Sequence, residues 1–213
     1  MNNIWDVYIF IVKLVTDKYL KSSPTPDSIA KALGAAQQNL FDYYKALKEQ
    51  GDESATTALA PFILTTPLTS NSSGLLAYPS NWADTELIIE TIGGIKTTAN
   101  PILDNELYEA RQSALYPIAY NIRYQEQYGG IQLYPEATHV TSYKYLVRPD
   151  YPVIGYTVSG NTQTYDSATS VQLQFRNQYW NKIILLAMPY IGVNLSNADI
   201  ASLGGLFNQP KSS

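Results

Sequence analysis

The clearest pattern of hydrophobic and polar positions lies at residues 131–148, which read IQLYPEATHVTSYKYLVR. Alternate residues share one face of a strand, and this stretch places β-branched and aromatic side chains at that spacing. The shared face comprises His139, Thr141, Tyr143, Tyr145 and Val147. A turn is expected at 135–138, because its proline fixes φ and cannot donate a ladder hydrogen bond. The pattern therefore predicts antiparallel sheet in the middle of the protein.

Two further segments predict strands of the same sheet. Residues 118–128 alternate between apolar and polar positions, and Gly129-Gly130 closes a hairpin onto the stretch just described. Residues 86–98 predict a strand pair or a bulged strand, with Gly93-Gly94 as the turn or the bulge. We therefore expect a sheet built from residues 86–98, 118–128 and 131–147.

The segments on either side of this sheet are less regular. Residues 61–82 have the composition of a linker, with clustered Pro, Ser, Thr and Asn and a possible strand at Leu75–Tyr78. Residues 151–166 resemble a protruding hairpin with a Ser-Gly-Asn tip. An isolated hairpin with this many apolar residues is not expected to stand alone in water.

Apolar residues at spacings of three and four predict three long helices, at 4–20, 28–49 and 171–188. Asp27 or Ser28 is expected to cap the second helix. Shorter helices are expected at 53–60, 103–114 and 197–206. The first helix is apolar over most of its girth, which predicts burial in a domain or against another subunit.

Together these elements predict an α+β fold in which N-terminal and C-terminal helices pack on a central antiparallel β-sheet and a hairpin protrudes. A chain of 213 residues can form one domain or two small ones. We predict a single domain over residues 1–213, with a helical part at 1–60, a β-rich part at 61–170 and C-terminal helices at 171–206.

Composition narrows the possible functions. Charged residues make up 15% of the chain and the net charge is −4, which argues against nucleic-acid binding through a basic patch. The absence of cysteine excludes disulfides, zinc–thiolate sites and thiol nucleophiles. The apolar N-terminus carries Asp6 and Lys13 and is too short to span a bilayer, so we predict a core helix and no membrane partner.

The chain has 18 tyrosines against 5 phenylalanines. Tyrosine offers a large rigid contact area with a hydroxyl that tolerates water, which suits protein–protein or sugar-binding surfaces. The plainer alternative is that these rings line strands. The predicted hairpin provides the candidate subunit interface: Tyr151, Val153, Ile154, Tyr156 and Val158.

No catalytic site is evident. His139 is the only histidine, and both a Ser-His-Asp relay and a zinc site would need it together with further groups. Its place in a strand among Thr and Tyr predicts a packed or surface strand residue, so its replacement by Ala should leave assembly largely intact unless packing is lost. The acidic residues match no calcium-loop spacing. We expect no enzyme activity, no cofactor and no metal.

Seven short segments follow one another in a recognisable order: 27–44 (DSIAKALGAAQQNLFDYY), 59–63 (LAPFI), 74–82 (GLLAYPSNW), 105–117 (NELYEARQSALYP), 131–149 (IQLYPEATHVTSYKYLVRP), 164–175 (TYDSATSVQLQF) and 180–188 (WNKIILLAM). In that order they resemble the neck proteins of tailed bacteriophages. More narrowly, they resemble the adaptor or ring proteins of phages that infect Bacteroidota, including crAss-like phages. The apolar first helix departs from this pattern.

The resemblance implies a structural virion protein with no catalytic residues. It implies a head-to-tail adaptor that is made in the host cytoplasm, lies in the neck of the virion and lines the DNA conduit. The implied partners are further copies of the chain in a ring of about twelve, the portal protein, and other neck or tail proteins. Head-to-tail contacts in such a ring need two different side patches on each subunit.

A Tyr-rich β module that binds carbohydrate or mediates adhesion is the alternative. Such a module should be secreted, monomeric and provided with an exposed aromatic platform, and the sequence shows no leader. An enzyme is the third and weakest possibility, because the chain lacks a nucleophile–base pair.

Overall fold

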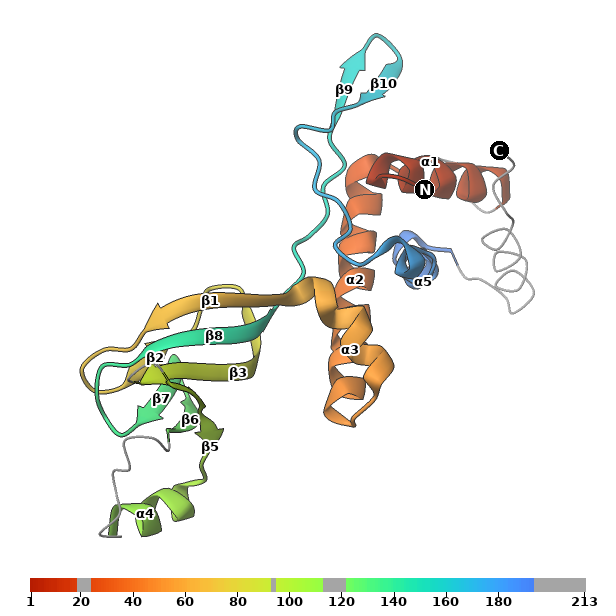
Figure 1. Ribbon diagram of the computed structural model, residues 1–213. Coiled ribbons are helices and arrows are strands. Elements are labelled where there is room, and N and C mark those ends of the chain that lie inside the picture. The colour runs from red at the N-terminus through yellow and green to blue at the C-terminus, as the bar shows by residue number, and fades with distance from the viewer. Residues whose placement is uncertain (19–23, 93–94, 113–121, 194–213) are drawn as a thin grey trace. The chain divides into compact units, whose positions relative to one another are not determined.

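The computed structural model describes residues 1–18, 24–92, 95–112 and 122–193 (Figure 1). Helices and mostly antiparallel sheets confirm the predicted α+β class. The chain divides into two compact units. The first, the helical unit, comprises Met1–Pro61 and Pro149–Ser213; the second, the sheet unit, comprises Phe62–Arg148. The first division follows Pro61, one residue beyond the end of the predicted helical part at 1–60.

The helical unit contains helices α1 (Ile4–Lys18), α2 (Pro26–Glu49), α3 (Glu53–Leu59) and α5 (Trp180–Ala187). Helix α2 packs against α3 and α5. Its buried positions recur every three to four residues and include Ile29, Leu33, Leu40 and Tyr44, as the sequence predicts.

The ends of α2 show how local sequence sets its length. The N-cap is Thr25 rather than the predicted Asp27 or Ser28, because its hydroxyl accepts the Ser28 N–H at 3.2 Å and Pro26 fits the first helical turn. Beyond the C-terminus, Gly51 adopts φ +86°, a left-handed conformation that favours glycine.

Helix α5 is shorter than the predicted 171–188. It is preceded by the 3-10 turn η2 (Asn177–Tyr179) and followed by η3 (Met188–Ile191). Residues 171–176 are not helical, since the backbone of Val171 exchanges hydrogen bonds of 3.0 and 2.9 Å with Val153. The predicted helix at 197–206 lies outside the described residues.

The sheet unit contains two four-stranded sheets. The first has the order β1-β8-β3-β4 and the second the order β2-β7-β6-β5. The elements are β1 (Ile63–Thr69), β2 (Leu75–Ala77), β3 (Trp82–Ile92), β4 (Ile95–Thr98), β5 (Asn100–Pro101), α4 (Asp104–Gln112), β6 (Arg123–Gln127), β7 (Gly130–Tyr134) and β8 (Val140–Val147). All the strand pairs are antiparallel except β5 with β6.

One predicted sheet is therefore two. Strands β7 and β8 both come from the stretch 131–148, but β7 pairs with β2 and β6 whereas β8 pairs with β1 and β3. The turn between them carries the chain from one sheet to the other. Side chains of both sheets then build one hydrophobic core, formed by Leu76, Ile88, Ala99, Ile122, Ile131, Leu133, Tyr143 and Tyr145.

The predicted linker at 61–82 is wrong in its first part, which forms β1, whereas the possible strand at Leu75–Tyr78 is confirmed by β2. Strand β1 pairs with β8 along its whole length, with Pro67 opposite Ser142. Proline is tolerated there because β1 is an edge strand and does not need every N–H for a ladder. The Pro- and Thr-rich composition concealed this strand.

The predicted packing of the N-terminal and C-terminal helices on the central sheet is not confirmed, and the prediction of a single domain stays a prediction. Helices α1, α2, α3 and α5 belong to the helical unit, and both four-stranded sheets belong to the sheet unit. The physical reason is that each unit closes its own core: α2 packs on α3 and α5, while the two sheets bury their apolar faces together.

Candidate assembly surface

The predicted hairpin is present in the helical unit. Strands β9 (Tyr156–Ser159) and β10 (Thr162–Tyr165) pair antiparallel around a tip at Gly160, whose φ is +61° (Figure 1). The paired strands begin at Tyr156, five residues later than the segment proposed from the sequence. The hairpin is therefore shorter than predicted and has a separate base.

Short contacts fix the base of the hairpin. The Gly155 N–H donates to Ser170 Oγ at 2.9 Å, and the Asp166 N–H donates to the Gly155 carbonyl at 2.9 Å. A Cβ at Gly155 would lie only 2.1 Å from Thr169 Oγ1, so a larger residue would displace this contact. The base thus holds the two strands in a defined position on the unit.

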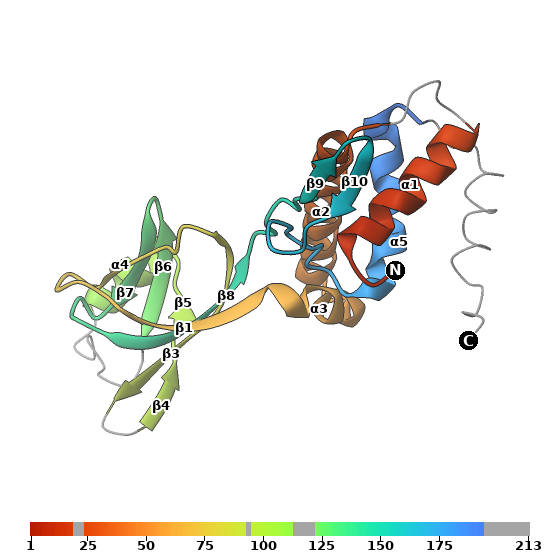
Figure 2. The ribbon, with the colours of Figure 1, turned by 90° about the horizontal axis from the view of Figure 1, so that it is seen from above.

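One face of the hairpin packs on helix α1 of the same chain (Figure 2). The Trp5 and Tyr165 rings stack at a centroid distance of 5.8 Å, and the Tyr8 hydroxyl donates to Gln163 Oε1 at 3.3 Å. Burial, with a smaller contribution from Tyr156, raises the pKa of Tyr8. Part of the apolar hairpin surface is therefore covered within the subunit.

Glutamine side chains join the segment after Pro149, where the chain returns to the helical unit, to helices α1 and α2. Gln37 is fully buried on α2, where its side chain donates to the Asp150 carbonyl and accepts the Gln174 N–H, both at 2.9 Å. Gln172 Oε1 accepts the Ile4 N–H at 2.7 Å. Sequence reasoning missed these residues, although a glutamine within the apolar stripe of α2 was a usable signal.

The five predicted interface residues have different environments. Val158, Tyr151 and Val153 are 63%, 59% and 45% exposed, and Tyr156 is half-buried. Ile154 is only 3% exposed and packs inside the unit, so its assignment to the interface needs correction. The bridge between Val153 and Val171 makes this segment extended, and neighbouring side chains therefore point in opposite directions.

Tyr151 also contacts helix α2. A Cβ placed at Gly34 would lie 2.3 Å from Tyr151 Cδ1, so glycine is needed for the ring to cross the helix at this distance. Gly34 lies among the apolar residues of α2, and a glycine at such a position indicates that another part of the chain approaches the helix closely. Tyr151 thus contributes to the subunit's own packing while more than half of it stays exposed.

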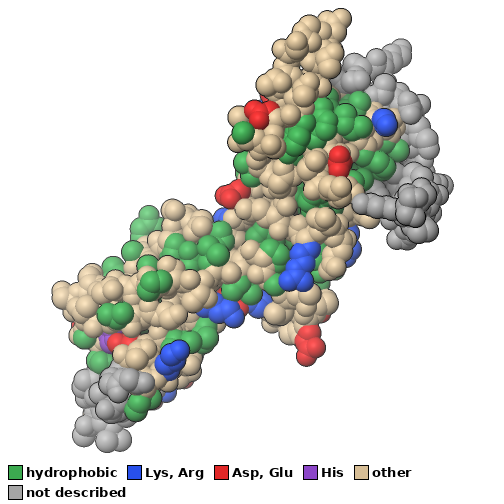
Figure 3. Space-filling model, turned by 45° about the horizontal axis from the view of Figure 1, so that its top comes forward, with side chains coloured by type: hydrophobic (Ala, Val, Ile, Leu, Met, Phe, Trp, Pro, Cys, Tyr) green, Lys and Arg blue, Asp and Glu red, His purple; other side chains and the backbone are tan. Residues whose placement is uncertain are grey.

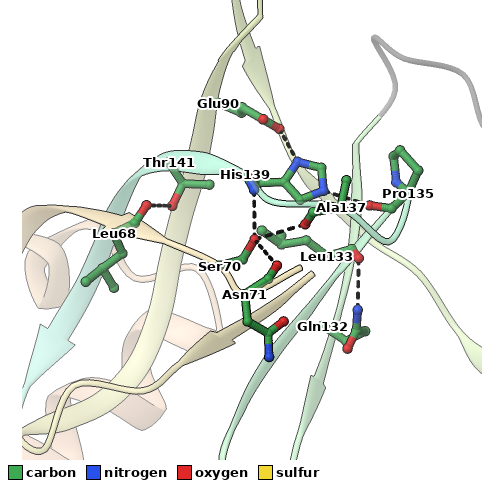
Figure 4. Close-up of polar contacts among 10 residues, drawn as sticks. All are labelled: Leu68, Ser70, Asn71, Glu90, Gln132, Leu133, Pro135, Ala137, His139 and Thr141. Atoms are coloured by element: carbon green, nitrogen blue, oxygen red, sulfur yellow. Dashed lines mark hydrogen bonds and ion pairs between the residues drawn. The ribbon is translucent and has the colours of Figure 1, made fainter. Parts of the chain in front are cut away.

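A second polar cluster surrounds His139 in the sheet unit (Figure 4). His139 Nδ1 lies 2.8 Å from Glu90 Oε2, and Nε2 lies 2.7 Å from the Pro135 carbonyl oxygen. Ser70 Oγ accepts the His139 N–H at 2.8 Å and donates to the Ala137 carbonyl at 3.1 Å. His139 is 5% exposed, so it is packed, but it lies directly before β8 (Val140–Val147) and not in a strand as predicted.

The arrangement of this cluster fits a structural role. The Pro135 carbonyl can only accept, so Nε2 must carry a hydrogen and donate it. The other nitrogen, Nδ1, lies within hydrogen-bond distance of the Glu90 carboxyl group. The imidazole therefore joins β3 to the turn that follows β7, and the His139 backbone N–H joins this turn to Ser70 at the end of β1. In the part of the chain that the structure describes, no group of three or more His, Cys, Asp or Glu side chains is placed to hold a metal ion.

Large hydrophobic side chains are exposed on both units (Figure 3). In the helical unit they include Tyr43, Tyr151, Val153, Val158, Val171, Leu186 and Tyr190. In the sheet unit they include Leu64, Ile95, Leu103, Tyr108, Tyr128 and Val140. Single exposed apolar residues are normal, but a set on each unit provides more than one possible contact surface.

Comparisons with known proteins add no family assignment, since no family model and no curated protein matches this chain. None of the described helices is long and apolar enough to cross a membrane.

Proposed function

We propose that the protein is a structural subunit of a tailed-phage virion. In this proposal it forms a ring in the neck, joins the portal to the tail and lines the DNA conduit, without catalytic activity. The order of the seven sequence segments suggests the family. The observation that carries the proposal is the hairpin β9–β10, which has a fixed base and an apolar face that α1 covers only in part.

The geometry of the hairpin supports a head-to-tail contact. Tyr156 and Tyr165 are paired across the two strands, as are Val158 and Gln163, so all four side chains share one face. Helix α1 contacts Tyr165 and Gln163 on this face, yet Val158 is 63% exposed. The apolar face thus continues beyond α1, where a neighbouring subunit could cover it.

Ring closure requires this surface to meet a different surface of the next subunit. Each pairwise contact can then be modest, because a closed ring holds every subunit on two sides. The low charge also suits a conduit, since a net charge of −4 would not hold DNA phosphates tightly.

Light scattering after size-exclusion chromatography, with electron microscopy of the peak, tests the proposal. The wild-type chain should form closed rings, alone or when mixed with its portal protein. Val158→Asp should lower ring formation at least about tenfold, because it places a charge in the contact. Thr157→Asp, on the opposite face of β9, is the matched control. A monomer with and without the portal would overturn the proposal.

One observation favours the alternative of a carbohydrate-binding module. Tyr78 and Trp82 stack at 4.0 Å in the sheet unit, and both are partly exposed. Burial, followed by the charges of Glu126 and Asp84, raises the pKa of the nearby Tyr124. Aromatic rings beside carboxylates are groups that sugars use for stacking and hydrogen bonding. Quenching of Trp fluorescence on a glycan panel, lost in Trp82→Ala, would support this second function.

A further inference from the structure

A groove between helices α2 and α5 has no role in the function proposed above. It has a volume of about 410 Å³ and is lined by Asn39, Leu40, Tyr43, Lys182, Leu185 and Leu186. Tyr43 is 56% and Leu186 41% exposed, so apolar side chains face solvent along the groove. Exposed apolar surface of this kind calls for a covering segment.

The two ends of the groove differ in chemistry. At one end, Lys182 Nζ donates to the Tyr44 hydroxyl at 3.0 Å and lies 5.5 Å from the centre of that ring. The hydrogen bond to Tyr44 raises the pKa of Lys182, which keeps the ammonium charged. Near the other end, Asn39 Nδ2 donates to the Tyr190 hydroxyl of η3 at 2.7 Å. An occupant should therefore be apolar and carry an acid near Lys182.

The described chain stops close to this groove. Gly192 adopts φ +82°, which turns the backbone after η3, and the Val193 N–H donates back to the Met188 carbonyl at 3.0 Å. Met188 is two residues beyond Leu186, or about 3 Å farther along a helix axis. The segment that follows Val193 thus starts within about one helical turn of the groove.

The composition of residues 194–213 complements the groove. The segment contains one acid, Asp199, and apolar residues at Leu195, Ile200, Leu203, Leu206 and Phe207. The six residues from 194 to 199 can span about 20 Å when extended. The distance along α5 from Leu186 back to Lys182 is about 6 Å, so Asp199 can reach the lysine.

We propose that residues 194–213 dock in the α2–α5 groove of their own chain, with the apolar side chains against Leu185 and Leu186 and Asp199 beside Lys182. The tether favours the same chain over a second copy, because it gives an effective concentration of order mM. Docking would cover the apolar surface of the helical unit. This inference does not depend on the proposed virion function.

Engineered cysteines test the proposal, because the natural chain has none. Full-length Leu186→Cys/Leu203→Cys should form an intrachain disulfide at least about tenfold faster than the control Val158→Cys/Leu203→Cys, since docking raises the local concentration of the two thiols. Intact mass after alkylation measures the rate. Equal rates in the two variants would overturn the proposal. A disulfide between chains in dilute protein would overturn docking in the same chain and assign the groove to a second copy.

A second measurement does not depend on which residues of the segment face Leu186. Chymotrypsin cleaves after Leu206 and Phe207, and docking should protect both bonds. Leu186→Asp should raise their cleavage rate at least about tenfold, whereas Val158→Asp, at a more exposed position of the same unit, should leave it unchanged. Cleavage that is equally fast in wild type and in both variants would show that the groove does not hold the segment.

Discussion

The two units are stabilised in different ways. The sheet unit is one continuous segment, Phe62–Arg148, and its two sheets share a hydrophobic core. The helical unit combines two segments that are separated by the whole sheet unit. Its returning segment is joined to α1 and α2 by side-chain hydrogen bonds, those of Gln37 and Gln172 among them.

This difference has a consequence for folding. Contacts within the sheet unit close loops inside 87 residues, the length of Phe62–Arg148. The hydrogen bond between Gln37 and Asp150 joins residues that are 113 apart in the sequence. The helical unit can therefore be completed only after the residues of the sheet unit have been synthesised and the segment after Pro149 has packed on α2. We therefore infer that the sheet unit is the more independent of the two.

Fragments should show the largest effect. Residues 62–148 alone should unfold cooperatively in urea, because all strands of the two sheets and their core are present. Residues 1–61 alone should lack fixed tertiary structure, since α5 and the segment after Pro149 are missing. Circular dichroism and the dispersion of amide NMR signals measure both. A well-dispersed spectrum for 1–61, or an unfolded 62–148, would contradict the comparison.

Loss of the buried imidazole should be a costly single substitution in the sheet unit. His139→Ala removes the partner of a Glu90 carboxyl group whose side chain is 10% exposed, and it leaves the Pro135 carbonyl without its donor. We expect the free energy of unfolding of the sheet unit to fall by about 3 kcal/mol. Urea midpoints measure the change. Val140→Ala, at a 63% exposed neighbour, is the control and should shift the midpoint little.

The same substitution distinguishes a loss of stability from a loss of assembly. Assembly of the His139→Ala variant should fall only as far as the sheet unit unfolds, because the imidazole is buried and not part of a contact surface. A His139→Ala protein with unchanged stability but no assembly would show that the residue acts at an interface instead.

In the helical unit, Gln37→Ala should cost about 2 kcal/mol, since it leaves the Asp150 carbonyl and the Gln174 N–H without their bonds to a buried side chain. Thermal unfolding of the full chain measures this loss. Gln178→Ala, at an exposed position of η2, is the matched control. Equal midpoints for the two variants would mean that the returning segment is not held through Gln37.

Local pattern predicted the elements in which apolar residues recur at a regular spacing. The apolar stripe of α2 and the shared face of His139, Thr141, Tyr143 and Tyr145 are both buried as expected. Glycine at Gly129 and Gly160 has the positive φ that the two predicted hairpins require.

The sequence pattern did not predict contacts between residues that are far apart in the sequence. Alternation shows that β7 and β8 are strands but does not show which partners they pair with, so one sheet was predicted instead of two. The candidate surface shows the same limit. The hairpin was found from its apolar residues and its tip, but the burial of Ile154 depends on packing that no local spacing reveals.

Alkaline pH should lower the stability of the sheet unit by a smaller amount than the substitutions above. Burial raises the pKa of Tyr143 and, with Glu126 as the next contribution, raises that of Tyr78 to about 12, against 10.0 for an unburied tyrosine. The unfolded sheet unit therefore loses its phenol protons first, so its stability is intact below pH 10 and falls as the pH rises toward 12. Urea midpoints of the 62–148 fragment at increasing pH test this. Tyr78→Phe should flatten the slope, and Tyr128→Phe, at a fully exposed ring, should not.

The smallest effect should come from the exposed ion pair of the same unit. Arg111 and Glu136 form a hydrogen-bonded pair, but their side chains are 49% and 53% exposed. Water screens such charges, and holding two long side chains in place costs entropy, so Arg111→Ala should change the free energy of unfolding by less than about 1 kcal/mol. The Arg111 guanidinium also lies 5.5 Å from the Tyr134 ring centre, and Arg111→Lys tests whether that contact contributes. If Arg111→Ala lowered the free energy of unfolding as much as His139→Ala does, burial would not explain the stabilising effect of the His139–Glu90 pair.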